Sequence, residues 1–286
     1  MAGVQVTATD STASRRVAFA AVDPKDLQAR IAEFPRWHYA FEFEGGVSTP
    51  VADGIMLNRH AQRRRYFFEP LLALMGGSLR GQRVLDLGCN AGFWSLNAVE
   101  AGADFVLGLD AQQSYLDQAS LVFEAKGIDA ARFRFERGNV FEHDFAEGFD
   151  LILCLGLLDH VHKPVELFEV MSGVGAELLL IDTAISRARS SLFELSSPYS
   201  TRDMVGPPLV LVPSRSAVVE LASQFGFKTV ALELNISDYS GMGDYRRGRR
   251  LAFVCSKSLP LDRLAAEKDQ SIVPWWVRDP RALRAV

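Results

Sequence analysis

Three polar side chains near the middle of the chain have the types and spacing needed to move a proton. Asp159, His160 and His162 follow residues 149–155, an almost wholly apolar run typical of a buried parallel strand. An unperturbed imidazole titrates near neutral pH, so His160 is the first candidate for a general base, with Asp159 beside it. The alternative is that His160 only packs near a bound molecule. His38, within an aromatic stretch, is a second candidate base.

A second group of residues has the spacing of a nucleoside-binding turn. An apolar run from Val84 leads into a turn that contains Gly88 and Gly92. Glycine lets the backbone turn sharply and approach a ligand without a Cβ clash, and the helix that follows offers free N–H groups. Asp110 follows the next apolar run, at roughly the 20-residue spacing of an acid that binds ribose hydroxyls. The alternative is a solvated strand-end aspartate that caps the next helix.

A dinucleotide is the main competitor for this geometry. Its fingerprint is Gly-x-Gly-x-x-Gly, but Asn90 and Phe93 occupy the second and third glycine positions here. The Phe93 ring would crowd a pyrophosphate that approaches the helix. The pattern therefore favours a cofactor that carries a ribose and no phosphate.

The elements that position these groups alternate strictly from residue 82 onward. Strand followed by helix, repeated with right-handed crossovers, predicts an α/β fold: a Rossmann-like, doubly wound, seven-stranded and mostly parallel sheet. The last two strands have no predicted helix between them and should form an antiparallel hairpin at the edge. The expected strands are 83–87, 105–109, 132–136, 149–155, 177–182, 229–234 and 251–256, and the expected helices are 93–100, 112–126, one from Pro164, and 214–225.

An extension precedes the alternating region. We expect a weakly ordered arm over 1–22, a helix over 24–34, aromatic residues over 34–43, and a helix over 56–75. His60 and His143 are interpreted as surface residues. The predicted organisation is an N-terminal extension and substrate cap (1–79), a cofactor-binding domain (80–257) with an irregular insertion covering the acceptor site (184–212), and a C-terminal tail (258–286).

Composition narrows the class of protein. The chain has 286 residues, is 48% apolar and carries a net charge of −4, enough for one large core and no global signature of nucleic-acid binding. Three dispersed cysteines favour neither disulfides nor a metal site and suggest a reducing cytoplasm. No secretory signal or membrane-spanning run is recognisable. The arginine runs 63–65 and 246–250 can contact RNA phosphates, but such runs are more often solvated or ion-paired.

The turn and the acid after it resemble the first two motifs of class I S-adenosylmethionine (SAM) dependent methyltransferases. The resemblance covers roughly residues 80–257 and extends to Gly138-Asn139-Val140, where the family recognises adenine. It implies that Asp86 lies near the methionine amino group, that Asp110 holds the ribose, and that Asn139 accepts a hydrogen bond from the adenine amine. The implied SAM-binding residues are Asp86, Gly88, Cys89, Asn90, Gly92, Asp110, Ala111, Asn139, Val140 and Leu155.

The run from Leu155 to Pro164 resembles one branch of that class, the tRNA wobble-uridine carboxymethyltransferases and their relatives. That branch carries a tyrosine where Asp159 stands, and in the carboxymethylating enzymes the tyrosine helps to hold the carboxylate of a carboxylated cofactor. An aspartate would repel that carboxylate. The difference favours ordinary SAM.

These observations predict a SAM-dependent methyltransferase acting on a small-molecule acceptor, as an O-methyltransfer in secondary metabolism. Two alternatives stay open: a tRNA wobble-uridine-type modifying enzyme, and a non-catalytic SAM-fold binding protein. Tyr199, Tyr239 and Tyr245 are possible acceptor-site residues by position alone. The sequence names neither the acceptor, nor the atom methylated, nor the oligomeric state.

Overall fold

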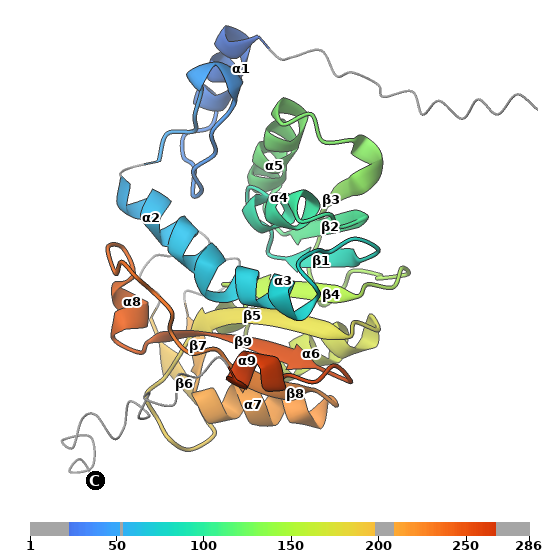
Figure 1. The fold of residues 1–286 in the computed structure, drawn as a ribbon, viewed down its shortest axis with the longest axis vertical. Coiled ribbons are helices and arrows are strands. Elements are labelled where there is room, and N and C mark those ends of the chain that lie inside the picture. The colour runs from blue at the N-terminus through green and yellow to red at the C-terminus, as the bar shows by residue number, and fades with distance from the viewer. Residues whose placement is uncertain (1–22, 52–53, 198–208, 267–286) are drawn as a thin grey trace, which may run out of the picture.

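The central sheet has the predicted number and direction of strands. The structure, a computed structural model, describes residues 23–51, 54–197 and 209–266. Its seven-stranded sheet has the order β3-β2-β1-β4-β5-β9-β8 (Figure 1), with β1 to β5 parallel and β9 antiparallel to both β5 and β8. The strands are β1 (Arg83–Leu87), β2 (Phe105–Asp110), β3 (Phe133–Arg137), β4 (Leu151–Leu155), β5 (Leu178–Ala184), β8 (Lys228–Ala231) and β9 (Arg250–Ser256).

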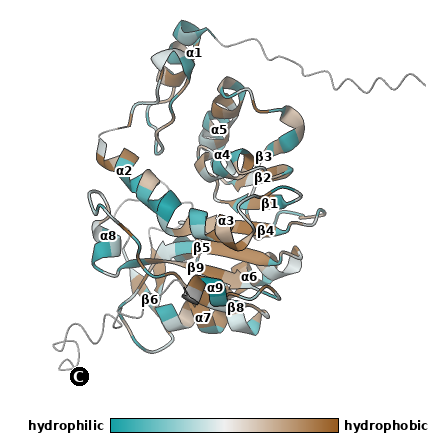
Figure 2. Cartoon of the chain, viewed as in Figure 1, coloured by the Kyte–Doolittle hydropathy of each residue, from teal (hydrophilic) through white to brown (hydrophobic). Residues whose placement is uncertain are grey.

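Helices cover both faces of this sheet. On one face α4 (Phe93–Glu100) and α5 (Gln113–Ala125) share a core with the N-terminal segment, and on the other face lie α6 (Pro164–Gly173) and α7 (Arg215–Gln224). Every residue of β4 is buried because helices cover it on both sides, which explains its wholly apolar sequence. Figure 2 shows largely apolar strands in the middle of the sheet and a mixture of polar and apolar residues in the helices around it.

The N-terminal segment forms a broken helix rather than the single helix predicted over 56–75. It contains α1 (Pro24–Ala32), α2 (Gly54–Arg63), a π-helical turn over Arg64–Phe68, and α3 (Glu69–Leu74). The π turn buries Tyr66, Phe67 and Phe68. Because a π turn holds one more residue than an α turn, the buried face of α2 does not continue in line into α3.

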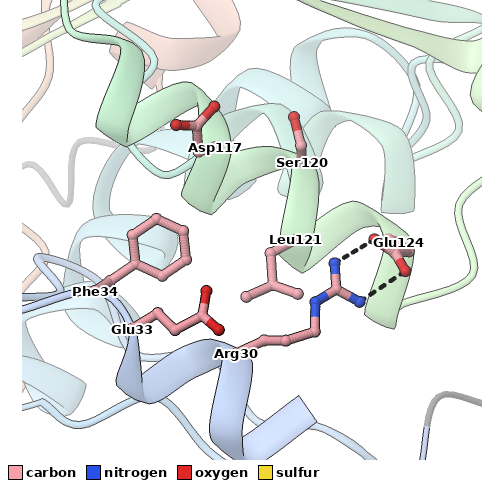
Figure 3. A pocket seen from close by; sticks show the side chains of 7 residues that line it. All are labelled: Arg30, Glu33, Phe34, Asp117, Ser120, Leu121 and Glu124. Atoms are coloured by element: carbon pink, nitrogen blue, oxygen red, sulfur yellow. Dashed lines mark hydrogen bonds and ion pairs between the residues drawn. The ribbon is translucent and has the colours of Figure 1, made fainter. Parts of the chain in front are cut away.

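The start of the N-terminal segment lies against α5. Figure 3 shows Arg30 of α1 making a bidentate ion pair with Glu124 of α5, at 2.6 and 2.8 Å. A cleft of about 270 Å³ beside this pair is lined by Arg30, Glu33, Phe34, Asp117, Ser120, Leu121 and Glu124. None of these residues belongs to the turns after β1, β2 or β4, so the cleft belongs to the contact between two helices and not to the site described below.

Several elements were not predicted. The insertion contains an antiparallel pair, β6 (Phe193–Ser196) and β7 (Val210–Pro213), and the helix α8 (Gly243–Arg246) lies between β8 and β9. The tail begins with α9 (Asp262–Ala266), and short 3-10 turns occur at Glu44–Gly46, Ala130–Arg132 and Leu158–His160. The arm over 1–22 and Tyr199 lie outside the described residues. Within the described ranges, no helix has the length and apolar character needed to cross a membrane.

Candidate active site

The turn after β1 has the backbone that its glycines predict. Gly88 and Gly92 have positive φ angles of 69° and 74°, and Asn90 between them has a φ of 50°. Asparagine tolerates the left-handed region better than most residues, and the Asn90 side chain accepts a hydrogen bond from the Ala91 N–H at 2.8 Å. Asn90 thus adopts the backbone that a second glycine would provide.

Close packing adds a second requirement for these glycines. A Cβ at Gly92 would lie 3.0 Å from the Ala119 Cβ, so the position is restricted by space as well as by its backbone. A Cβ at Gly88 would lie 3.4 Å from Leu157, the second residue after β4. The loop after β4 therefore bounds the space next to the turn after β1.

Asp110 joins the ends of β1 and β2. One carboxylate oxygen accepts the Asn90 N–H at 2.9 Å and the other accepts the Gln112 N–H at 2.9 Å. The residue is partly exposed. Because each carboxylate oxygen can accept more than one hydrogen bond, both retain capacity for a ribose hydroxyl. The alternative role, helix capping, is also present in the Gln112 contact, and the two roles are compatible.

Asp86 is a buried carboxyl group with no ion-pair partner among the residues that the structure describes. It is 1% exposed and accepts the Ser95 hydroxyl at 2.6 Å. Burial raises the pKa of Asp86 to about 7, and the Ser95 hydrogen bonds only partly offset this effect. A positively charged group next to Asp86 would remove much of this penalty. This matches the position that the resemblance assigns to the methionine amino group of SAM.

Unpartnered nitrogen atoms lie where α2 meets the start of α4. His60, Arg63 and Trp94 are each at most 4% exposed, and the His60 ring nitrogens, the Arg63 Nε and the Trp94 Nε1 have no hydrogen-bond partner among the described residues. The Arg63 guanidinium lies 5.2 Å from the Trp94 ring centre, and the His60 ring lies 5.1 Å from that of Phe93. Buried polar atoms normally have partners. These groups, next to the turn, therefore fit a site for a polar ligand such as SAM.

The prediction that His60 lies on the surface is wrong. Its ring packs 4.7 Å from that of Tyr39, and its pKa is lowered to about 3, first by burial and then by repulsion from Arg63. His143 is also not a surface residue, because it is partly buried and pairs with Glu136 at 2.6 Å. The His60 contacts depend on separate segments, those of Tyr39 and Phe93, for which the sequence held no signal, whereas Glu136 is only seven residues from His143.

The remaining predicted cofactor residues line the same sheet edge. Asn139 is exposed, and it accepts the Phe141 N–H at 3.2 Å while donating to Glu142 at 2.9 Å. Its oxygen can accept a second hydrogen bond, so its role toward adenine stays a prediction. Cys89, Leu155, Ala111 and Val140 occupy buried or partly buried positions at the ends of β1, β4, β2 and β3.

Asp159 and His160 form a short 3-10 turn after β4. Asp159 is 5% exposed and accepts hydrogen bonds from the Thr183 hydroxyl at 3.0 Å and the Ala184 N–H at 3.4 Å. The His160 Nε2 lies 3.6 Å from the second Asp159 oxygen, and the His160 Nδ1 has no partner in the described part of the chain. At 3.6 Å this carboxylate is too distant for a hydrogen bond, yet close enough to stabilise an imidazolium.

A cavity of about 660 Å³ opens beside this pair, a volume typical of small-molecule sites. The ends of β4 and β5, the β6–β7 pair and the start of β9 form its wall. The lining residues are Asp159, His160, Ala184, Ile185, Ser186, Arg187, Glu194, Ser196, Ser197, Val210, Val212, Arg249 and Arg250. Residues of β6 and β7, which lie within the insertion, line this cavity, and the role of the insertion as a cover stays a prediction.

Three other candidates, the possible base His38 and the tyrosines Tyr239 and Tyr245, do not line this cavity. His38 is partly buried and packs edge-on against Tyr39 at 4.7 Å, and it is not among the residues that line the cavity. Tyr245 is fully buried, and Tyr239 packs against the core, so neither lines it either.

Tyr245 instead binds Asp182, a residue that sequence reasoning missed. Asp182 is fully buried at the end of β5, where it accepts the Tyr245 hydroxyl at 2.8 Å, Arg63 at 2.7 Å and Arg250 at 2.9 Å. Burial alone would raise the pKa of Asp182, but the two arginines and the hydroxyl outweigh it and lower the pKa. We call these four residues the Asp182 cluster. It joins α2 and α8 to β5 and β9 of the central sheet.

Comparisons with known proteins agree with this geometry. Residues 84–175 match a family described as a methyltransferase domain. The tRNA U34 carboxymethyltransferase of Idiomarina loihiensis is 25% identical over 158 residues, covering 54% of this chain and 48% of that protein. A ubiquinone biosynthesis O-methyltransferase of Bordetella avium is 34% identical over 90 residues, covering 32% and 36%. The chain thus spans about half the length, or less, of these curated relatives.

Solved structures support the fold. The N-terminal domain of EvdMO1 with SAH bound aligns with a TM-score of 0.62 and 21% identity, over 82% of this chain and 96% of that one. A magnesium protoporphyrin IX methyltransferase from Synechocystis with bound SAM aligns with a TM-score of 0.52 and 14% identity, over 84% and 99%. At these identities the likeness concerns the fold alone.

The sheet order and the turn after β1 define a Rossmann-like fold of the class I methyltransferase type. Residues 84–175 match a methyltransferase domain, and structural neighbours with bound SAH or SAM support SAM as the cofactor. The acceptor of the methyl group is a separate question.

Proposed function

We propose that this protein transfers the methyl group of SAM to an oxygen atom of a small acceptor held in the 660 Å³ cavity. The observation that carries the proposal is the position of His160, which lines that cavity next to a buried carboxylate. Asp86, Gly88 and Asp110 would hold the amino group, backbone and ribose of the cofactor. Asn90 and Gly92 maintain the turn, and Asn139 and Val140 would contact the adenine.

In the proposed mechanism, the residues after β1, β2 and β3 hold SAM, and the residues after β4 remove the proton of the acceptor. Bound SAM supplies a methyl group on a positively charged sulfur atom. His160 would accept the proton of the acceptor hydroxyl as the hydroxyl oxygen takes the methyl group, which would leave SAH as the second product. Asp159, held by Thr183 and Ala184, stabilises the imidazolium that results. The β6–β7 pair limits the access of water.

A tRNA substrate is the second candidate, because relatives named for tRNA modification match 54% of the chain. The arginine runs give it little support. Arg63 and Arg250, one from each run, are buried against Asp182 and cannot reach a phosphate. Arg64, Arg65, Arg246, Arg247 and Arg249 remain as the only members able to do so.

The test replaces the proposed base and keeps the cofactor site intact. With radiolabelled SAM and a panel of small hydroxylated acceptors, His160→Gln should lower kcat at least a hundredfold, because general-base catalysis contributes about two to four orders of magnitude. His162→Gln is the matched control, since His162 is exposed and bonds only the Leu209 carbonyl. Unchanged turnover in His160→Gln would refute the assigned base.

Calorimetry with SAH separates an enzyme from a non-catalytic binding protein. Bound SAH together with labelled product supports the proposal, and bound SAH with no transfer to any acceptor, tRNA transcripts included, supports the binding protein. The mass added to the product distinguishes ordinary SAM, which adds a methyl group, from a carboxylated cofactor.

A further inference from the structure

Charged side chains line the cavity, and their pairing is uneven. Besides His160, five charged residues line it: Asp159, Glu194, Arg187, Arg249 and Arg250. Arg250 is paired within the Asp182 cluster, where its Nε donates to Asp182 at 2.9 Å. This leaves two carboxylates and two guanidinium groups to be accounted for.

The two carboxylates are already engaged. One Asp159 oxygen binds Thr183 and Ala184, and the other faces His160. Glu194 accepts the Ser186 hydroxyl at 2.7 Å. Neither carboxylate lies within ion-pair distance of Arg187 or Arg249 among the residues that the structure describes. The guanidinium groups of Arg187 and Arg249 therefore have no ion-pair partner among the described residues of the cavity wall.

Arg249 combines a fixed backbone with an unengaged head group. Its N–H donates to the Asp244 carbonyl at 2.8 Å, and its carbonyl accepts the Ile185 N–H at 2.8 Å. The guanidinium is exposed and makes no hydrogen bond or ion pair with any described residue. The stem is thus held in place by two chain segments while all five N–H donors remain available.

Arg187 lies on the neighbouring segment. Residues 185–187 continue β5, and residues 247–249 precede β9, so the antiparallel register of β5 and β9 places the two segments side by side. Arg187 makes one hydrogen bond, to the Arg247 carbonyl at 2.9 Å, which directs its head toward the Arg249 segment. Two guanidinium groups on adjacent segments suit the planar oxygen pairs of a carboxylate or the oxygens of a phosphate.

We infer that the methyl acceptor is a small anion, a hydroxylated carboxylate or phosphate ester. Arg187 and Arg249 bind its anionic group, and its hydroxyl lies toward His160. This inference rests on the proposed function and names its substrate class. The chain as a whole has a net charge of −4, so these two guanidinium groups without carboxylate partners are a feature of this cavity wall and not of a generally basic surface.

The test compares acceptors that differ only in the anionic group. Suitable pairs are 3,4-dihydroxybenzoate with its amide for a carboxylate, and glucose 6-phosphate with glucose for a phosphate. We expect kcat/KM for at least one anion to exceed that of its neutral partner tenfold or more. Arg249→Gln or Arg187→Gln should raise KM for the anion about tenfold and leave the neutral partner unaffected. Arg246→Gln, exposed but outside the cavity lining, is the control.

Direct binding keeps the inference testable without turnover. With SAH-saturated protein, calorimetry should detect 3,4-dihydroxybenzoate or inorganic phosphate, and the Arg187→Gln/Arg249→Gln double variant should lose that binding while SAH affinity is unchanged. Binding of neither anion, equal use of neutral partners, or label transfer to a tRNA transcript alone would overturn the inference. Failure of the wild-type protein to bind SAH would instead contradict the proposed function.

Discussion

Two buried aspartates at the same edge of the sheet have opposite surroundings. Among the described residues, Asp86 near the end of β1 has the Ser95 hydrogen bonds and no ion pair, and its pKa is raised to about 7, whereas Asp182 near the end of β5 has two arginines and a lowered pKa. An unpaired buried carboxylate destabilises a protein unless something binds to it, while a paired one is part of its architecture. Asp182 thus holds segments together, and the surroundings of Asp86 support the proposal that it receives a cation.

The largest expected effect comes from breaking the Asp182 cluster. Asp182→Asn should lower the free energy of unfolding by about 3–5 kcal/mol, because it leaves Arg63 and Arg250 buried without a countercharge. Asp86→Asn is the matched control and should leave this free energy unchanged or higher at pH 8, where it removes an unpaired buried charge. Urea unfolding measures both. A loss below 1 kcal/mol for Asp182→Asn would contradict the comparison.

The pH dependence should differ between the two aspartates. The folded protein holds a proton on Asp86 up to about pH 7, while the unfolded chain releases it near pH 4. The free energy of unfolding of the wild type, relative to Asp86→Asn, should therefore fall by on the order of 3 kcal/mol as the pH rises from about 4 to 7. If the difference in the free energy of unfolding between the two proteins does not change from pH 4 to pH 7, then Asp86 has a cationic partner in the folded protein.

The contribution of Asp182 to stability changes with pH in the opposite direction. Because its folded pKa is lowered, its contribution to stability is present above about pH 4 and is lost as the pH falls through the folded value. Acid unfolding of the wild type below pH 4 should therefore be steeper than that of Asp182→Asn, measured by circular dichroism.

Cofactor binding gives a more specific test of Asp86. If the amino group of SAH lies beside it, the bound ligand should favour the carboxylate, so wild-type protein should release a proton on binding SAH at pH 6. Asp86→Asn should release none and should bind about thirtyfold more weakly, roughly 2 kcal/mol for a hydrogen bond between charged groups. Calorimetry in two buffers of different ionisation enthalpy measures both quantities.

The smallest expected effect concerns the ribose. Asp110→Ala should weaken SAH binding about tenfold, about 1.4 kcal/mol. Asp117→Ala, on the exposed side of α5, is the control and should bind normally. Equal affinity of the two variants would refute the role of Asp110 toward the ribose.

The sequence was informative where a site comes from one short stretch of chain. The strand, turn and helix from Val84 to Glu100 lie next to one another, so apolar patterning and two glycines were enough to predict them. Asp110 followed from the next strand, because parallel strands end at the same edge. The sheet and most element positions were therefore predictable.

The other half of the site depends on contacts between distant segments. Nothing local to Arg63 or Arg250 distinguishes a buried ion pair from a solvated basic run, and Tyr245 was assigned to the acceptor site by position alone. The inward face of α2, with His60 and Arg63, was also missed, because the π turn after it breaks the helical period. Tertiary packing determines the positions and partners of these residues, and a single sequence does not show tertiary packing.

The Asp182 cluster also sets an order on the assembly of the chain. Arg63 is synthesised early, Asp182 much later, and Arg250 later still, yet all three share one carboxylate. A ribosome-bound chain that has not yet reached Asp244 and Arg250 lacks the partner of Arg59 on α2 and one member of the Asp182 cluster, so α2 can complete its contacts only after β9 has been made. A helix that is synthesised early is thus among the last elements to gain all of its contacts.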